Sequence, residues 1–235
     1  MKLAIMQPYF FPYLGYFQLL HAVDRFVVYN DVAFIKQGWV NRNRILINGQ
    51  PSYVTVPLKQ ASSFRVIRDI EIDDSPQNRL WPARFLKSVD NAYRRAPQFD
   101  RVFPVIESVL DAGATKVGDL AFASVRAVAS YLGLNTEWVD TSARYGNADL
   151  AGQERVLAIC RAERATEYIN AAGGVELYSR EEFARAGVTL RFLASSPHEY
   201  RQFGAPFVPW LSIIDVLMFN TPDEVGELMR RYELT

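Results

Sequence analysis

The chain has 235 residues, of which 49% are hydrophobic and 22% are charged, so it can bury the core of an ordinary globular protein. Lys plus Arg (26) equals Asp plus Glu (26), and this neutral balance argues against a general nucleic-acid binder, which would carry a basic excess. A single cysteine, Cys160, excludes an internal disulfide, and because we find neither a signal peptide nor an apolar run of about 18 residues, we expect a cytoplasmic protein with no membrane span.

The first thirty residues are typical of a βαβ unit. Residues 3–6 and 25–29 are short, continuously apolar runs, which suit parallel strands that are covered on both faces. Two prolines in residues 7–12 interrupt regular structure, and residues 13–23 are apolar on nearly every side, which predicts a buried helix. The sequence therefore predicts a Rossmann-like start with a right-handed crossover.

A β-hairpin is predicted next. Residues 44–47 and 53–58 flank Asn48-Gly49, a pair that favours the positive φ angles of a type I′ turn. Residues 66–72 alternate between apolar and polar, which predicts a half-exposed strand.

The remainder alternates between helical and strand patterns, as expected for an α/β fold. Ser75-Pro76 predicts a helix start, and Pro82 a kink or a restart of the same helix. Helices are predicted at residues 75–95, 102–111, 117–132, 153–163, 179–186, 212–220 and 223–232, and strands at residues 137–140, 168–171 and 189–193, the last completing the strand set. We therefore expect one domain over residues 1–235, with a mainly parallel sheet, flanking helices, a hairpin insertion and a helical C-terminal part.

Two loops at the predicted carboxyl ends of the first strands carry polar and aromatic side chains, and ligands of open parallel sheets bind at such ends. The first loop enters a helix, whose backbone N–H groups can face an anion. The candidate binding residues in the two loops are Gln7, Tyr9, Tyr16, Trp39, Asn41, Arg42 and Asn43, and the candidate catalytic residues are Asp31 and Lys36. An equally simple interpretation places the aromatic rings in the core, the cations on a solvated surface and Asp31 in a turn.

A third polar stretch, residues 195–210, contains His198 together with Tyr200 and Gln202, which are two further candidate binding residues. Histidine titrates near neutral pH, so His198 is a candidate general acid or base, with an exposed loop histidine as the alternative. His21 falls within the buried helix, which favours a structural role. Asp215 follows Ser212 at a capping-box spacing, which also favours a structural role.

Several common sites are missing from the sequence. Two histidines and one cysteine in separate segments provide no zinc spacing, and the sequence contains no phosphate-binding P-loop, no dinucleotide fingerprint and no Gly-x-Ser-x-Gly motif. We therefore predict no metal and no cofactor. Cys160 lies in an apolar helical run and is better explained as a small core residue than as a nucleophile.

Three motifs together resemble the WbqC-like protein family. They are Gln-Pro-Tyr-Phe-Phe-Pro-Tyr-Leu-Gly-Tyr-Phe at residues 7–17, the stretch of residues 31–45, and Phe-Val-Pro-Trp-Leu-Ser-Ile-Ile-Asp-Val-Leu-Met-Phe-Asn at residues 207–220. The resemblance spans the whole chain. It implies a link to bacterial O-antigen and polysaccharide gene clusters, and a transferase that adds glycine or a similar acyl group to a sugar. It brings no catalytic residues, so the candidates above depend on their chemistry.

The first βαβ unit is also similar, more distantly, to the nucleotidyltransferase fold. The His-x-Gly-His motif of those enzymes corresponds here to Tyr13-Leu14-Gly15-Tyr16. Tyrosine replaces both histidines and contacts phosphate poorly, which argues against nucleotidyl transfer while allowing a relation in fold.

The first hypothesis is therefore an aminoacyl or acyl transferase acting on an amino sugar or a nucleotide-linked sugar. His198 or Asp31 would be the base, and Lys36, Asn41 and Arg42 would bind the anionic part of the donor or acceptor. An aminoacyl- or acyl-loaded carrier protein is the alternative donor, and no nucleic-acid partner is expected. A nucleotidyltransferase-like enzyme and a non-catalytic ligand-binding protein of a glycan pathway remain as alternative functions.

Overall fold

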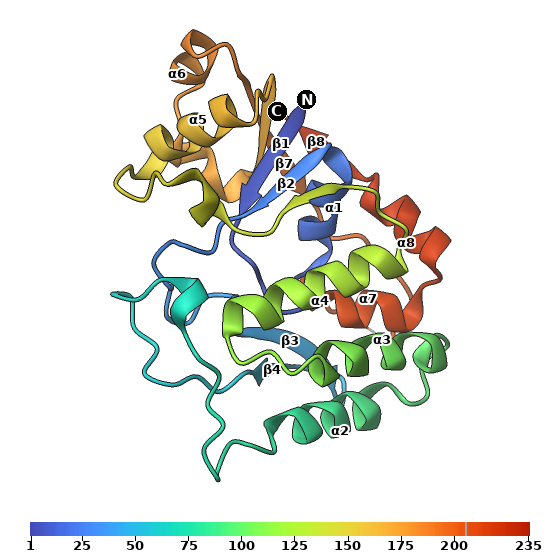
Figure 1. Ribbon diagram of the computed structural model, residues 1–235. Helices are drawn as coiled ribbons and strands as arrows, with labels where there is room; N and C mark the ends of the chain where they lie inside the picture. Colours follow the sequence, from blue (N-terminus) through green and yellow to red (C-terminus); the bar gives the residue numbers. More distant parts are fainter. Residues whose placement is uncertain (205) are drawn as a thin grey trace.

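A six-stranded sheet forms the centre of the computed structural model, which describes residues 1–204 and 206–235 (Figure 1). Its order is β5-β2-β1-β6-β7-β8, with β1 at Lys2–Met6, β2 at Arg25–Val28, β5 at Glu137–Val139, β6 at Glu167–Ala171, β7 at Thr189–Ser195 and β8 at Tyr232–Leu234. Neighbouring strands run parallel, except that β8 is antiparallel to β7. The predicted mainly parallel sheet is confirmed.

Both faces of the sheet are covered, which explains the apolar runs of β1 and β2. Because side chains alternate along a strand, Leu3 and Ile5 of β1 enter one hydrophobic cluster and Ala4 enters the other. The helices α5 (Gly152–Ala162) and α6 (Arg180–Arg185) cover the first face, and α1 (Leu14–Ala22) lies on the opposite side with α8 (Pro222–Met229) (Figure 1).

The strand β1 lies between strands that come from two different parts of the chain. The helix α1 leads to β2 on one side of β1, whereas β6 lies on the other side, so the strand order reverses between β1 and β6. In open α/β sheets ligands bind at the carboxyl ends of the strands near such a reversal. For β1 this end is Met6, which leads directly into the loop of residues 7–13.

The predicted hairpin is present as β3 (Arg42–Ile47) and β4 (Gln50–Thr55), which form a separate two-stranded antiparallel sheet. Asn48 and Gly49 have φ angles of 51° and 73°, as the type I′ turn requires. Three helices complete this part of the molecule, α2 (Trp81–Tyr93), α3 (Phe99–Asp111) and α4 (Val117–Tyr131), and with the hairpin they occupy the lower half of Figure 1.

Two predictions about residues 66–95 are wrong. Residues 66–72 form a single 3-10 turn, Ile67–Asp69, because their N–H groups bond to separate segments: Ile67 to the carbonyl of Val32 at 3.0 Å and Ile72 to that of Thr115 at 2.9 Å. The helix predicted from residue 75 begins only at Trp81, and Pro82 occupies its first turn, where the missing N–H group costs nothing.

The C-terminal part departs from the prediction at one point. The helices α7 (Ile213–Phe219) and α8 are present, and a capping box of Thr221 and Glu224 starts α8. The chain then adds β8 to the edge of the sheet, so β7 does not complete the strand set. Cys160 is a buried core residue, as predicted, and burial raises the pKa of its thiol to about 12. Among the described residues, no helix is long and apolar enough to cross a membrane.

Candidate functional site

A cavity of about 270 Å³ opens beside the loop that follows β1. Its lining combines four aromatic rings with one amide and one guanidinium group. The lining residues are Tyr9, Pro12, Tyr13, Trp39, Asn43, Arg44 and Trp210. Aromatic walls with a few fixed polar groups are the usual composition of small-ligand pockets, and this volume lies close to their lower size range of about 300 Å³.

A larger cavity, of about 610 Å³, is a weaker candidate. It lies around His21, Asp24 and Arg230, beside the start of β2, and is therefore at the amino ends of the parallel strands. Ligand sites of open sheets lie at the opposite, carboxyl ends. We therefore take the aromatic cavity as the candidate site.

One wall of the aromatic cavity is a strained loop that is held from several sides. Phe11 has a φ of 41°, a conformation that costs a bulky residue about 1–3 kcal/mol. Its N–H group donates to Ser124 Oγ at 2.8 Å, and its carbonyl accepts from Asn43 Nδ2 at 2.7 Å and from Ser212 Oγ at 2.7 Å. Asn43 Nδ2 also donates to the carbonyl of Phe10 at 3.2 Å. These bonds from distant segments fix the loop before any ligand binds.

Trp210 forms the opposite wall and is strained in the same way, with a φ of 60°. Arg44 Nη2 donates to the carbonyl of Trp210 at 3.1 Å, and the N–H group of Ser212 donates to the carbonyl of Arg44 at 2.8 Å. The Trp210 ring meets the Tyr13 ring edge-on, with 6.0 Å between centroids. Non-glycine residues in this conformation cluster at functional sites, and here two of them flank one cavity.

Trp39 supplies a third wall from the loop before β3. Its ring stacks on Tyr53 of β4 with 6.4 Å between centroids, and the Arg42 guanidinium lies 4.7 Å from the centroid of the same Tyr53 ring. Trp39 and Trp210 are 38% and 43% exposed, so both rings present a face to an entering molecule.

The predicted residues of the first loop divide between cavity and core. Tyr9 lines the cavity, and burial raises its pKa and that of Tyr13, so both phenols stay protonated donors. Tyr16 is buried in the core, its hydroxyl donates to the carbonyl of Gln7 at 3.0 Å, and its pKa is raised well above the usual value by burial. Gln7 and Tyr16 therefore support the loop from below rather than line the cavity.

Asp31 lies in a different cluster, at the carboxyl end of β2. Its Oδ2 accepts from Arg155 Nη2 at 2.5 Å, and its Oδ1 accepts from the Ser142 hydroxyl. The side chains of Asp31 and Arg155 are only 5% and 4% exposed. Arg155 also donates to Asn147 Oδ1 at 3.2 Å and lies over the Tyr29 ring at 5.0 Å. Both oxygens of the proposed base are therefore engaged, outside the aromatic cavity.

His198 is half-buried and lies behind the Trp210 wall. It lines a small cavity of about 30 Å³ that shares Tyr13 and Trp210 with the aromatic cavity. Its Nε2 is 2.6 Å from the carbonyl oxygen of Arg231. Since a carbonyl only accepts, Nε2 carries the proton and Nδ1 keeps a free lone pair in the neutral ring. This is the tautomer that a general base needs.

Tyr200 and Gln202 hold a buried carboxyl group. Asp215 Oδ2 accepts from the Tyr200 hydroxyl at 2.6 Å and from Gln202 Nε2 at 2.8 Å, while its Oδ1 accepts from the Tyr93 hydroxyl at 2.8 Å. Burial raises the pKa of Asp215, although the three donors oppose that shift. This network anchors the segment that leads to Trp210, in keeping with the structural role expected for Asp215.

The other predicted cations and amides have mixed environments. Lys36 is exposed on the loop before Trp39. Asn41 donates to the carbonyl of Val56 at 3.0 Å and so helps to form the hairpin. Arg42 donates to the carbonyl of Gln37. Within residues 1–204 and 206–235, no three acidic, histidine or cysteine side chains come together as a metal site.

Sequence reasoning omitted four residues that the structure makes prominent. Tyr13, Arg44 and Trp210 line the cavity and belong to the motifs at residues 7–17, 31–45 and 207–220, but they were not among the candidates. Arg155 was also missed, although a charge next to Val156 and Leu157 in a helical pattern could have indicated a buried ion pair.

The comparison with known families agrees with this arrangement. The model of the WbqC-like protein family matches residues 7–227, nearly the whole chain. The chain belongs to the WbqC-like family. The matched region includes every residue that lines the aromatic cavity, so the cavity is built from the family's own segments.

One relative of this WbqC-like protein is the uncharacterised protein Rv1507c of Mycobacterium tuberculosis, which is 28% identical over 232 residues, with 97% of each chain covered. No solved structure matches the chain.

Proposed function

We propose that this WbqC-like protein is a group transferase of bacterial surface-polysaccharide or glycoconjugate biosynthesis. It transfers glycine or another aminoacyl or acyl group to an amino sugar or a nucleotide-linked sugar. The observation that carries the proposal is the preformed aromatic cavity with Asn43 and Arg44 at its wall. A sugar ring has an apolar C–H face and polar edges, which suits aromatic walls with a few hydrogen-bonding groups.

The reaction requires a base and a donor for the developing oxyanion. The sugar amine attacks the acyl carbonyl carbon, a C–N bond forms, and the bond from that carbon to the donor's leaving group breaks. We assign the amine proton to His198 Nδ1, which then returns it to the leaving group. The Tyr13 hydroxyl, a protonated donor that lines both cavities, holds the carbonyl oxygen, and Lys36 binds the anionic part of the donor.

His198 is preferred over Asp31 as the base for a geometric reason. The small cavity that His198 lines adjoins the aromatic cavity through Tyr13 and Trp210, whereas Asp31 is paired with Arg155 elsewhere. For proton transfer, the amine of a bound sugar must enter this small cavity.

A nucleotidyltransferase-like reaction receives less support. Of the two tyrosines that replace that motif's histidines, Tyr16 is buried and bonded to the carbonyl of Gln7, so it does not face the cavity. A protein-borne donor, such as an aminoacylated carrier protein, remains compatible with the partly exposed rings of Trp39 and Trp210.

The test is a thermal-shift screen with nucleotide sugars, amino sugars, nucleoside triphosphates and coenzyme A thioesters. A ligand at a hundred times its Kd stabilises the folded state by about 2.7 kcal/mol, which raises the Tm of a chain of this size by roughly 5–10 °C. We expect this shift with a nucleotide sugar or an amino sugar, and its loss in Trp39→Ala. Triphosphate binding with pyrophosphate release would instead support nucleotidyl transfer.

The catalytic assignment is tested separately with His198→Ala. We expect the unfolding curve to stay close to that of the wild type and acyl transfer to be lost. Full activity in this variant would remove His198 from the mechanism.

A further inference from the structure

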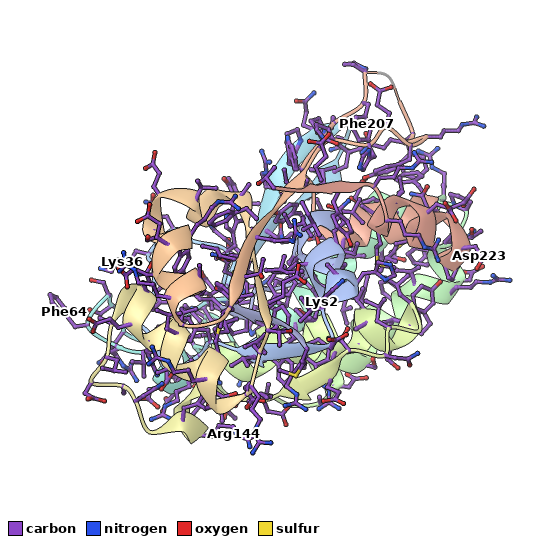
Figure 2. The ribbon with its side chains drawn as sticks, turned by 90° about the horizontal axis from the view of Figure 1, so that it is seen from above. Lys2, Lys36, Phe64, Arg144, Phe207 and Asp223 are labelled. Atoms are coloured by element: carbon purple, nitrogen blue, oxygen red, sulfur yellow. The ribbon has the colours of Figure 1, made fainter. Side chains whose placement is uncertain are left out.

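Positive charge is concentrated in one segment of this otherwise neutral chain. Residues 32–68 contain six Lys or Arg residues and no Asp or Glu. Lys59 and Arg68 of this segment have acidic neighbours. Within the described part of the chain, no carboxylate lies within 4.0 Å of the charged nitrogens of Lys36, Arg42 or Arg44. Figure 2 shows Lys36 and Phe64 of this segment on the side of the molecule opposite to Asp223.

Two of these cations flank the aromatic cavity from the same strand. Arg42 and Arg44 are two positions apart on β3, so their side chains leave the same face of the hairpin. Arg44 lines the cavity itself. Arg42 lies over Tyr53, which stacks on the cavity residue Trp39. Arg44 is therefore part of the cavity wall, and the Arg42 guanidinium is one aromatic ring away from another wall residue, Trp39.

Neither guanidinium group has its hydrogen-bonding capacity filled. A guanidinium carries five N–H donors. Among the described residues, the guanidinium of Arg44 donates one hydrogen bond, to the carbonyl of Trp210, and that of Arg42 donates one, to the carbonyl of Gln37. The Nε of each arginine is buried and has no acceptor among the described residues. The Nη1 group of each arginine also has no acceptor among the described residues, and it is not buried, so a ligand with several anionic oxygens can bind both side chains there.

We infer that Arg42 and Arg44 form a phosphate-binding subsite at the rim of the aromatic cavity, which takes the phosphate or diphosphate of a phosphorylated or nucleotide-linked sugar. The inference rests on the proposed function, because it places the sugar ring against Trp39 and Trp210. Arginine matches phosphate oxygens with two parallel hydrogen bonds, and two arginines on one strand face can each take one phosphate of a diphosphate. The subsite thus selects phosphorylated over neutral acceptors.

The experiment is a calorimetric titration of the purified protein with inorganic pyrophosphate, orthophosphate and uridine diphosphate at constant ionic strength. The variants are Arg42→Gln and Arg44→Gln, and the matched control is Arg68→Gln, which removes an exposed cation from the same segment. We expect saturable binding to the wild type. Each of the first two variants should weaken it on the order of tenfold to a hundredfold, the loss of one charge-assisted hydrogen bond. Arg68→Gln should stay within twofold of the wild type.

Because Arg44 also supports Trp210, Arg44→Gln could weaken binding by unfolding the loop, and a second variant separates the two effects. Arg44→Lys keeps the charge and removes the planar fork, so it should fold and still bind pyrophosphate more weakly than the wild type. Tighter binding of pyrophosphate and uridine diphosphate than of orthophosphate identifies the diphosphate of a nucleotide-linked sugar. Equal binding identifies a monophosphate, and both results support the subsite.

Two results would overturn the subsite: no saturable binding of any of the three phosphates, or an equal loss in Arg68→Gln, which would mean general charge attraction. The proposed transferase can fail independently. Phosphate binding without acyl transfer leaves the subsite intact and removes the transferase. Acyl transfer to a neutral amino sugar without phosphate binding would support the transferase and remove the phosphate subsite.

Discussion

Removing one member of the Asp31–Arg155 ion pair should destabilise the protein far more than removing both. The two side chains are at most 5% exposed and 2.5 Å apart, so Arg155→Met leaves a buried carboxylate whose only side-chain partner among the described residues is the Ser142 hydroxyl. Breaking a buried pair in this way costs about 3–5 kcal/mol, or roughly 6–20 °C in Tm for a chain of this size. Asp31→Asn should cost a similar amount, because it leaves the guanidinium uncompensated. The double variant Asp31→Asn/Arg155→Met removes both charges and should recover most of the loss.

Urea unfolding followed by circular dichroism measures the three free energies of unfolding, and the double-mutant cycle gives the coupling between Asp31 and Arg155. A loss below about 1 kcal/mol in Arg155→Met would show that the pair is solvated and contradict the burial. A double variant whose loss equals the sum of the single losses would contradict the pairing. The same double variant also tests the base: acyl transfer that persists without the Asp31 carboxylate excludes Asp31 from catalysis.

Three further changes have defined outcomes. Gly15→Ala should leave the Tm of the free protein within a few degrees of the wild type, since alanine favours helices by about 1 kcal/mol over glycine. The added Cβ would lie 2.3 Å from the Tyr13 ring and displace this cavity wall, so the ligand-induced thermal shift should disappear. Asn43→Ala should lower the free energy of unfolding by about 2–4 kcal/mol in urea, because it removes two donors from buried carbonyls beside the strained Phe11. Burial raises the pKa of Asp215 in the folded state, so the stability that this group contributes is full below its unfolded pKa and is lost as pH rises through the folded pKa. Asp215→Asn should therefore flatten the dependence of Tm on pH above about 4, and an unchanged slope would contradict this origin.

The elements predicted correctly are those in which local pattern and tertiary environment agree. The strand β1 is apolar from Leu3 to Met6 because both of its faces are buried, and the Asn48-Gly49 turn depends on backbone angles that these two residues adopt locally. The strand prediction for residues 66–72 is wrong because an alternating pattern is typical of any extended, half-buried segment. Whether such a segment becomes a strand depends on partners far along the chain, here Val32 and Thr115.

The candidate site was predicted only in part for a similar reason. Tyr9, Trp39 and Asn43 were chosen for their chemistry and do line the cavity, whereas Tyr16 has the same chemistry and is buried beneath it. Which face of a loop or helix turns outward depends on packing. The pairing of Asp31 with Arg155, 124 residues away, lies beyond any local pattern.

The two strained residues explain why the three motifs occur together in one chain. Phe11 and Trp210 belong to the first and last motifs, and the middle motif holds both, through Asn43 to the carbonyl of Phe11 and through Arg44 to that of Trp210. Ser212 of the last motif bonds to both of the others, at the carbonyls of Phe11 and Arg44. Each motif thus satisfies backbone groups that the others expose. A cavity fixed in this way loses little conformational entropy when a ligand enters, so the aromatic contacts contribute more fully to affinity.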